Sequence, residues 1–230
     1  MEKHLCRLAL RVLEYDKRLG PDGFECFNQD YLALRLALEK YFGASPAGLV
    51  DLFTGAWVGG EARRVKVALD GESVGSTYSL AQRYPSTHQD LELGTVYRNA
   101  PGAPFDLVCT LPTEEGGDAV MIAYECRHTQ RLASKAGKVD GAEISAAVAK
   151  VEEVCSRDMR PFVLVFISNR SVSSEVNILS QGMLAEALQA GGLLSRAIVI
   201  VRQNCIDYFG PILAMRFMGY IEPGDVSSSS

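Results

Sequence analysis

The spacing of apolar residues near the start of the chain predicts two helices. In the first, charged residues take the face opposite an apolar stripe. The stripe consists of Leu5, Leu8, Ala9, Val12 and Leu13. Gly20 to Gly23 ends this helix. A second helix is expected over 24–42, with Gly43 at its end. Its expected apolar stripe is Tyr31, Leu34, Leu38 and Phe42.

Strand patterns dominate the second half of the chain. Residues 105–111 and 119–127 predict a hairpin, because a Gly- and Pro-containing turn separates two β-branched and aromatic runs. The continuous apolar runs 162–167 and 197–201 are typical of strands buried on both faces. Helices are expected over 141–157, 180–190 and 211–218, whereas 44–104 predicts only one or two strands, among them the alternation Val65, Val67, Leu69. The fold class is therefore α/β.

The length of the chain limits the number of domains, and its net charge limits the binding partners. With 230 residues, 47% hydrophobic and 22% charged, we expect one large domain with a helical arm. The expected boundaries are an N-terminal arm at 1–22, an α/β domain at 23–222 and a disordered tail at 223–230. A net charge of −5 means that any nucleic-acid binding must come from a local basic surface.

The sequence also predicts where the protein resides. No stretch reaches the ~18 apolar residues of a membrane helix, so we expect an intracellular, soluble protein without a membrane partner. Six scattered cysteines without a C-x-x-C pattern argue against a zinc module and a disulfide framework.

The hairpin gathers the charged residues that carry candidate chemistry. A register symmetric about the loop pairs Leu111 with Val120 and carries Asp106 opposite Glu125. Asp106, Glu125 and Arg127 then share one face. The other face is apolar: Phe105, Leu107, Cys109, Leu111, Val120, Ile122, Tyr124 and Cys126.

Two facing carboxylates repel each other unless a cation lies between them. Arg127 can supply this charge in part. Mg²⁺ would do so better, since it binds few protein carboxylates and keeps water that can attack a phosphodiester. The alternative is structural: Asp106 begins a strand, and Glu125 with Arg127 forms a solvated ion pair.

The order of elements and these residues resemble the PD-(D/E)XK family, in which an Asp and a Glu-x-Lys supply metal ligands and a cation. Asp106 and Glu125 match the acids, and Arg127 stands at the Lys position. The resemblance implies a restriction-endonuclease-like mixed sheet flanked by helices, with an extra helix at the N-terminus. It also implies a third acid on a helix, for which Glu25 and Glu39 are the candidates. A guanidinium cannot act as a general base.

Within this family, the chain resembles the nuclease-like domain of Crinkler-type effectors and of kinetoplastid retrotransposon hot spot proteins. The segments that carry this resemblance, between Phe24 and Val201, are Gly23-Phe24-Glu25, Phe105-Asp106, the strand from Tyr124 to Gln130 and the two later apolar strands. The resemblance implies nuclear residence. Since no G-x-x-x-x-G-K-[ST] occurs, no ATPase is implied.

A local basic segment follows the Glu125 strand. From Glu125 to Lys138, one acid accompanies four cations: Arg127, Arg131, Lys135 and Lys138. Arg131, Lys135 and Lys138 are the predicted nucleic-acid contacts, with DNA favoured over RNA, and Arg63, Arg64 and Lys66 could add to them. The alternative is a solvated loop.

Two main functions follow from these observations. The first is a nucleic-acid-binding, nuclease-like protein that hydrolyses phosphodiester bonds with Mg²⁺ held by Asp106, Glu125 and Glu25. The second is an inactive scaffold of the same fold that binds a protein partner or nucleic acid. A third interpretation is a fragment of a longer effector-like protein. Cys126 with His128 as nucleophile and base, or as metal ligands, is a weak alternative, because the thiol falls on the apolar face.

Overall fold

The fold consists of a mixed sheet with helices on both faces. The computed structural model describes residues 2–15, 21–43, 46–85, 90–114, 119–129, 137–156, 160–172 and 193–218. The described helical segments are α1 (Glu2–Glu14), α2 (Pro21–Phe42), α3 (Leu49–Leu52), η1 (Ala62–Arg64), α4 (Gly141–Ser156), η3 (Leu193–Arg196) and α7 (Cys205–Met218). The strands are β1 (Ala47–Gly48), β2 (Trp57–Val58), β3 (Lys66–Val67), β4 (Thr77–Ser79), β5 (Val96–Arg98), β6 (Leu107–Leu111), β7 (Val120–Arg127), β8 (Phe162–Ser168) and β9 (Ala197–Ile200).

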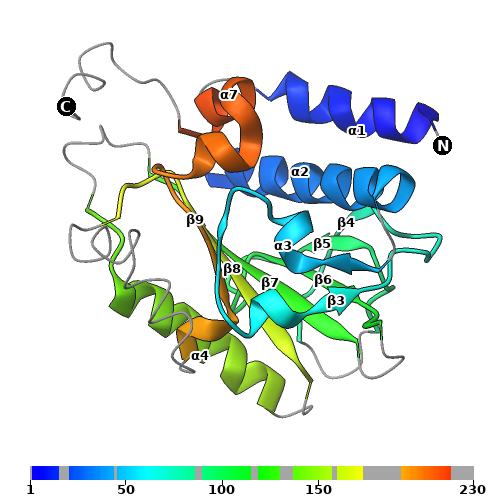
Figure 1. Cartoon of the computed structure of the whole chain (residues 1–230). Helices are drawn as coiled ribbons and strands as arrows, with labels where there is room; N and C mark the ends of the chain where they lie inside the picture. Colours follow the sequence, from blue (N-terminus) through cyan, green and yellow to red (C-terminus); the bar gives the residue numbers. More distant parts are fainter. Residues whose placement is uncertain are drawn as a thin grey trace.

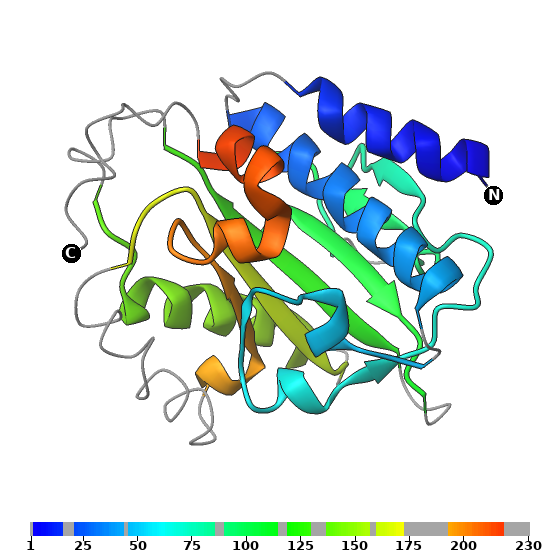
Figure 2. The same cartoon turned by 45° about the horizontal axis from the view of Figure 1, so that its top comes forward.

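The main sheet has the order β2-β9-β8-β7-β6-β5-β4. Strands β7, β8 and β9 run parallel to one another, whereas β5, β6 and β7 form an antiparallel meander. β1 and β3 pair separately. Helices α1, α2 and α7 lie over one face and α4 lies over the other (Figures 1 and 2).

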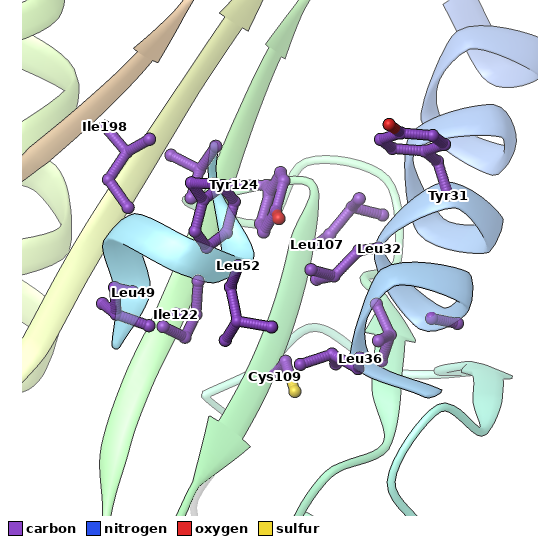
Figure 3. Packing of buried hydrophobic residues seen from close by; sticks show 14 of the residues in the cluster. Tyr31, Leu32, Leu36, Leu49, Leu52, Leu107, Cys109, Ile122, Tyr124 and Ile198 are labelled. Atoms are coloured by element: carbon purple, nitrogen blue, oxygen red, sulfur yellow. The ribbon is translucent and has the colours of Figure 1, made fainter. Parts of the chain in front are cut away.

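Two hydrophobic clusters fill the space on the two faces of the sheet. Val163, Val165 and Ile167 of β8 belong to the cluster under α2, and Phe162, Leu164 and Phe166 to the cluster against α4. Figure 3 shows the first cluster, where side chains of α2 and α3 meet those of the central strands. Because both faces are covered, the central strands are continuous apolar runs.

The predicted hairpin is confirmed, and its register is confirmed from Leu107 to Leu111. The paired residues include Leu111 with Val120, Cys109 with Ile122 and Leu107 with Tyr124. The expected strands at 162–167 and 197–201 are β8 and β9, and the helix at 141–157 is α4. The expected helix at 180–190 and the tail lie outside the described residues.

Several predictions about packing are wrong. α2 is enclosed at its N-terminal half by the sheet, α1 and α7, where Tyr31 contacts Tyr208. This cover does not reach Leu38 and Phe42 of the predicted apolar stripe, which are 41% and 75% exposed. Leu13 is also exposed, because α1 contacts the core through Leu8 and Val12.

The region 44–104 holds five short strands rather than one or two.

No helix in the described ranges combines the length and apolar character that crossing a membrane requires.

Candidate functional site

Asp106 lies where the pairing of β6 with β7 ends. Its N–H donates to the carbonyl oxygen of Tyr124 at 2.8 Å, and its Oδ2 accepts from the N–H of Cys126 at 2.6 Å. The regular ladder stops at the Leu107–Tyr124 pair, so the expected strand pairing of Asp106 with Glu125 does not form. The Asp106 carboxylate instead accepts the hydrogen bond from the Cys126 N–H, which a backbone carbonyl oxygen would accept in a regular ladder.

This change of register moves Phe105 to the other face of the sheet. Phe105 was expected beside Leu107, but it belongs to the cluster against α4 and its ring centroid lies 6.2 Å from that of Tyr84. Asn99, 8% exposed, fixes this segment: its amide donates to the carbonyl oxygens of Tyr84 and Phe105 at 3.0 and 3.1 Å. The N–H of Asn99 also donates to the carbonyl oxygen of Asp106 at 2.7 Å. Asp106 is therefore held on both sides.

Glu125 is a buried carboxylate surrounded by cations. It lies on β7 with only 6% of its surface exposed. It forms an ion pair with Arg127, and its Oε1 lies 3.6 Å from Nζ of Lys150 on α4. Burial raises its pKa, Arg127 and Lys150 oppose the rise, and the charge of Asp106 adds to it. Burial likewise raises the pKa of Asp106, while the Cys126 N–H and Arg127 oppose the rise.

Glu25 is a third acid, whose charge interacts with that of Asp106. It lies near the start of α2, and burial, with smaller contributions from Asp106 and Asp22, raises its pKa to about 7. Asp106 thus interacts electrostatically with both Glu25 and Glu125. Glu39, the other candidate, is fourteen residues further along the helix, about 21 Å away. Of the two candidates, Glu25 is the one near Asp106.

The raised pKa of Glu25 predicts a pH dependence of stability. Between about pH 4.5 and 7 the folded protein binds more protons than the unfolded chain, so the stabilisation is complete below pH 4.5 and is lost as pH rises through about 7. Over this pH range, the free energy of unfolding of Glu25→Gln should fall by about 1–2 kcal/mol less than that of wild type. Each pKa unit is worth ~1.4 kcal/mol, and the effect is reduced here because solvent screens a half-buried group.

Urea unfolding of the metal-free protein across this pH range measures the effect. Glu39→Gln, on the same helix but far from Asp106, is the matched control. A Glu25→Gln protein whose stability falls with pH as steeply as that of wild type would contradict the assignment.

The structure also places the predicted cations. Arg127 pairs with Glu125, and its Nε lies 4.0 Å from Oε1 of Glu143. Lys138 is exposed. Arg131 and Lys135 lie outside the described residues. Arg63 and Arg64 cannot join this surface: they follow β2, and the N–H of Glu61 donates to the carbonyl oxygen of Ser195 at 2.9 Å, at the opposite edge of the sheet.

The Cys126 thiol is unsuited to act as a nucleophile. Burial raises its pKa well above the usual value, and the nearby charges of Asp106, Glu25 and Glu125 raise it further. Burial lowers the pKa of His128, whose ring packs 4.9 Å from that of Phe24. The region around the pair thus disfavours a thiolate.

The number and chemistry of the acids determine which metal ion they suit. Within the described residues, no three or more Asp, Glu, His or Cys side chains are grouped to hold a metal ion. Mg²⁺, however, takes one or two protein carboxylates and completes its shell with water and substrate phosphates. Asp106 and Glu125 fit that smaller requirement as oxygen ligands.

Comparisons of the chain with protein-family models, with curated proteins and with solved structures find no significant match.

Proposed function

We propose that this chain is a nuclease-like protein with a restriction-endonuclease-like core that hydrolyses phosphodiester bonds with Mg²⁺. The order of elements supports the proposal: α2, the antiparallel meander β5-β6-β7, α4 and then β8 parallel to β7. In this core an Asp precedes the second strand of the meander and a Glu-x-Arg ends the third.

The observation that carries the proposal is the gathering of charged groups from separate elements. Glu25 comes from α2, Asp106 from the start of β6, Glu125 from β7 and Lys150 from α4. Buried like charges cost stability, and perturbed pKa values are concentrated at functional sites. A divalent cation and a bound phosphate would relieve the cost.

The carboxylates and the cations would have separate roles. Asp106 and Glu125 would hold Mg²⁺, which when bound polarises a phosphoryl oxygen and acidifies a water molecule. Arg127 and Lys150 would stabilise the negative charge that develops on the phosphoryl oxygens. Glu25, with a pKa of about 7, can hold or release a proton near neutral pH.

Lys150 supplies a lysine near the position where the family motif has Lys and this chain has Arg127. A lysine ammonium is a compact point charge, unlike the planar guanidinium of an arginine. The 3.6 Å distance between Nζ of Lys150 and Oε1 of Glu125 puts such an ammonium beside the acid pair. Because Lys150 comes from a helix, the motif residues alone do not indicate it.

The test combines metal binding and cleavage on the same samples. Mg²⁺ or Mn²⁺ is titrated by calorimetry into wild type and into an Asp106→Asn/Glu125→Gln protein, and each is assayed for plasmid nicking. Saturable binding and nicking are expected in wild type and absent from the double variant. Glu114→Gln is the control, because this carboxylate pairs with Lys66 at the far end of the hairpin.

The second candidate function is an inactive scaffold of the same fold. The ion pair between Arg127 and Glu125 favours it. The guanidinium of Arg127 already neutralises Glu125, at the position where an active enzyme of this family would have a catalytic lysine. A wild-type protein that binds no divalent metal and cleaves neither DNA nor RNA would reject the nuclease proposal and favour the scaffold, with a protein or nucleic acid as its partner.

A further inference from the structure

Three parallel strands of the main sheet lead into arginine residues at the same edge. β7, β8 and β9 are parallel neighbours, so their carboxyl ends lie together (Figure 1). Arg127 is the last residue of β7, Arg170 follows β8 by two residues and Arg202 follows β9 by two. In open α/β sheets, ligands bind outside the carboxyl ends of such strands.

Hydrogen bonds fix the chain beyond the ends of the strands. Asn169, 7% exposed, donates through Nδ2 to the carbonyl oxygen of Thr129 at 2.8 Å and accepts from the Thr129 N–H at 3.0 Å. The hydroxyl of Ser168 donates to the carbonyl oxygen of Arg127 at 2.8 Å. The N–H of Arg202 donates to the carbonyl oxygen of Arg170 at 3.2 Å. These bonds hold the three backbones as one ordered edge.

Lys138 belongs to the same edge. The next residue, Val139, forms a β-bridge with Val172, and its N–H donates to the carbonyl oxygen of Ser171 at 2.9 Å. The exposed Lys138 is thereby held near the chain that follows β8.

Cations at this edge outnumber the carboxylates beyond the acid site by one. Glu143, on the first turn of α4, forms an ion pair with Arg170 and also approaches Arg127, so one carboxylate is shared between two arginines. Lys138 and Arg202 are the other cations, and Asp140, which accepts from the Glu143 N–H at 2.8 Å, and Asp207 on the first turn of α7 are the other carboxylates. Neighbouring strands are about 4.8 Å apart, so the three strand ends span roughly 10 Å, which is about three nucleotides of a duplex strand.

We infer that Lys138, Arg170 and Arg202 bind the phosphate backbone of a nucleic acid whose scissile bond lies at the Asp106–Glu125 site. This inference rests on the proposed function and specifies how its substrate is held. The contacts are with phosphates, so they set position and affinity but carry no sequence preference. Arg127 connects this edge to the acids, because it pairs with Glu125.

The experiment is a salt titration of binding. A short labelled DNA duplex, and an RNA duplex of the same sequence in parallel, are titrated with full-length protein without divalent metal. Fluorescence anisotropy follows binding between about 50 and 200 mM salt. The test variants are Lys138→Ala, Arg202→Ala and the double variant. Lys138 is exposed, so its variant keeps the test valid if loss of Arg202 affects folding.

The control is Arg63→Ala/Arg64→Ala, which removes two exposed arginines from the opposite edge of the sheet. The double variant at the strand ends should bind about 10- to 100-fold more weakly, and its slope of log K against log salt should be smaller by about 2, close to one per cation. The control should match wild type.

The outcomes separate this inference from the proposed hydrolysis. Equal affinity and slope in wild type and the double variant would overturn the inference even if the protein cleaves DNA. Failure of wild type to bind either duplex would overturn it as well. Binding that depends on Lys138 and Arg202 without any cleavage in Mg²⁺ would support the phosphate contacts at the strand ends and reject the proposed hydrolysis.

Discussion

Replacing Lys150 with methionine is expected to slow phosphodiester cleavage by about 10²–10³-fold, the usual effect of losing one preorganised group that stabilises transition-state charge. Methionine keeps most of the length of the side chain but removes the ammonium beside Glu125. Arg127 still pairs with Glu125, so the fold should survive. Single-turnover cleavage rates at saturating protein measure the effect, because they isolate the chemical step from binding.

Two further variants test whether the effect belongs to Lys150. Lys66→Met removes a lysine whose Nζ lies 3.4 Å from a carboxylate oxygen of Glu114, far from the site, and should cleave as wild type does. Arg127→Met should slow cleavage less than Lys150→Met does. The opposite order, with Lys150→Met close to wild type, would assign the cationic role to Arg127 and contradict this prediction.

Replacing Arg11 with alanine is expected to lower the free energy of unfolding by about 2–3 kcal/mol. Arg11 joins α1 to α2 through an ion pair with Asp30, whose side chain is 7% exposed. Without Arg11, the Asp30 carboxylate still accepts the hydrogen bond from the Tyr15 hydroxyl, at 2.8 Å, but it lacks a nearby opposite charge from α1. An unpaired buried charge costs about 3–5 kcal/mol, reduced here because the Arg11 side chain is 38% exposed.

A double-mutant cycle separates lost charge pairing from lost packing. In an Asp30→Asn background, Arg11→Ala should cost clearly less, since no buried charge is then left alone. Arg7→Ala, an exposed arginine on the same helix, should change stability by less than about 0.5 kcal/mol. An equal loss in both backgrounds would mean that Arg11 acts through packing alone. Urea unfolding of wild type, the three variants of the cycle and Arg7→Ala provides the five values.

The central sheet could be predicted from the sequence because its signals are local. The runs 162–167 and 197–201 are apolar on both faces, and the hairpin register follows from the symmetry of its two strands. The alternation Val65, Val67, Leu69 predicted the strand that is β3, but the other short strands in 44–104 could not be predicted. β2, for example, has two residues and depends on β9, far along the chain. Tertiary contacts determine such strands more than propensity does.

The candidate site was predictable only in part. Asp106, Glu125 and Arg127 follow from the hairpin, but the bond between Asp106 Oδ2 and the Cys126 N–H is a side-chain event that strand periodicity does not indicate. That bond also explains why Phe105 lies on the unexpected face. Lys150 belongs to a helix 25 residues beyond Glu125 in sequence and shows no spacing signal, so only the packing of α4 on the sheet reveals it.

The two edge strands of the main sheet, β2 and β4, are short, and this affects how the molecule behaves at high concentration. β2 has two residues and β4 has three, so in the described structure each margin offers little open backbone to another chain. An intruding chain could therefore form only a few ladder hydrogen bonds at either margin. Edge strands this short oppose intermolecular strand pairing and the aggregation that it seeds.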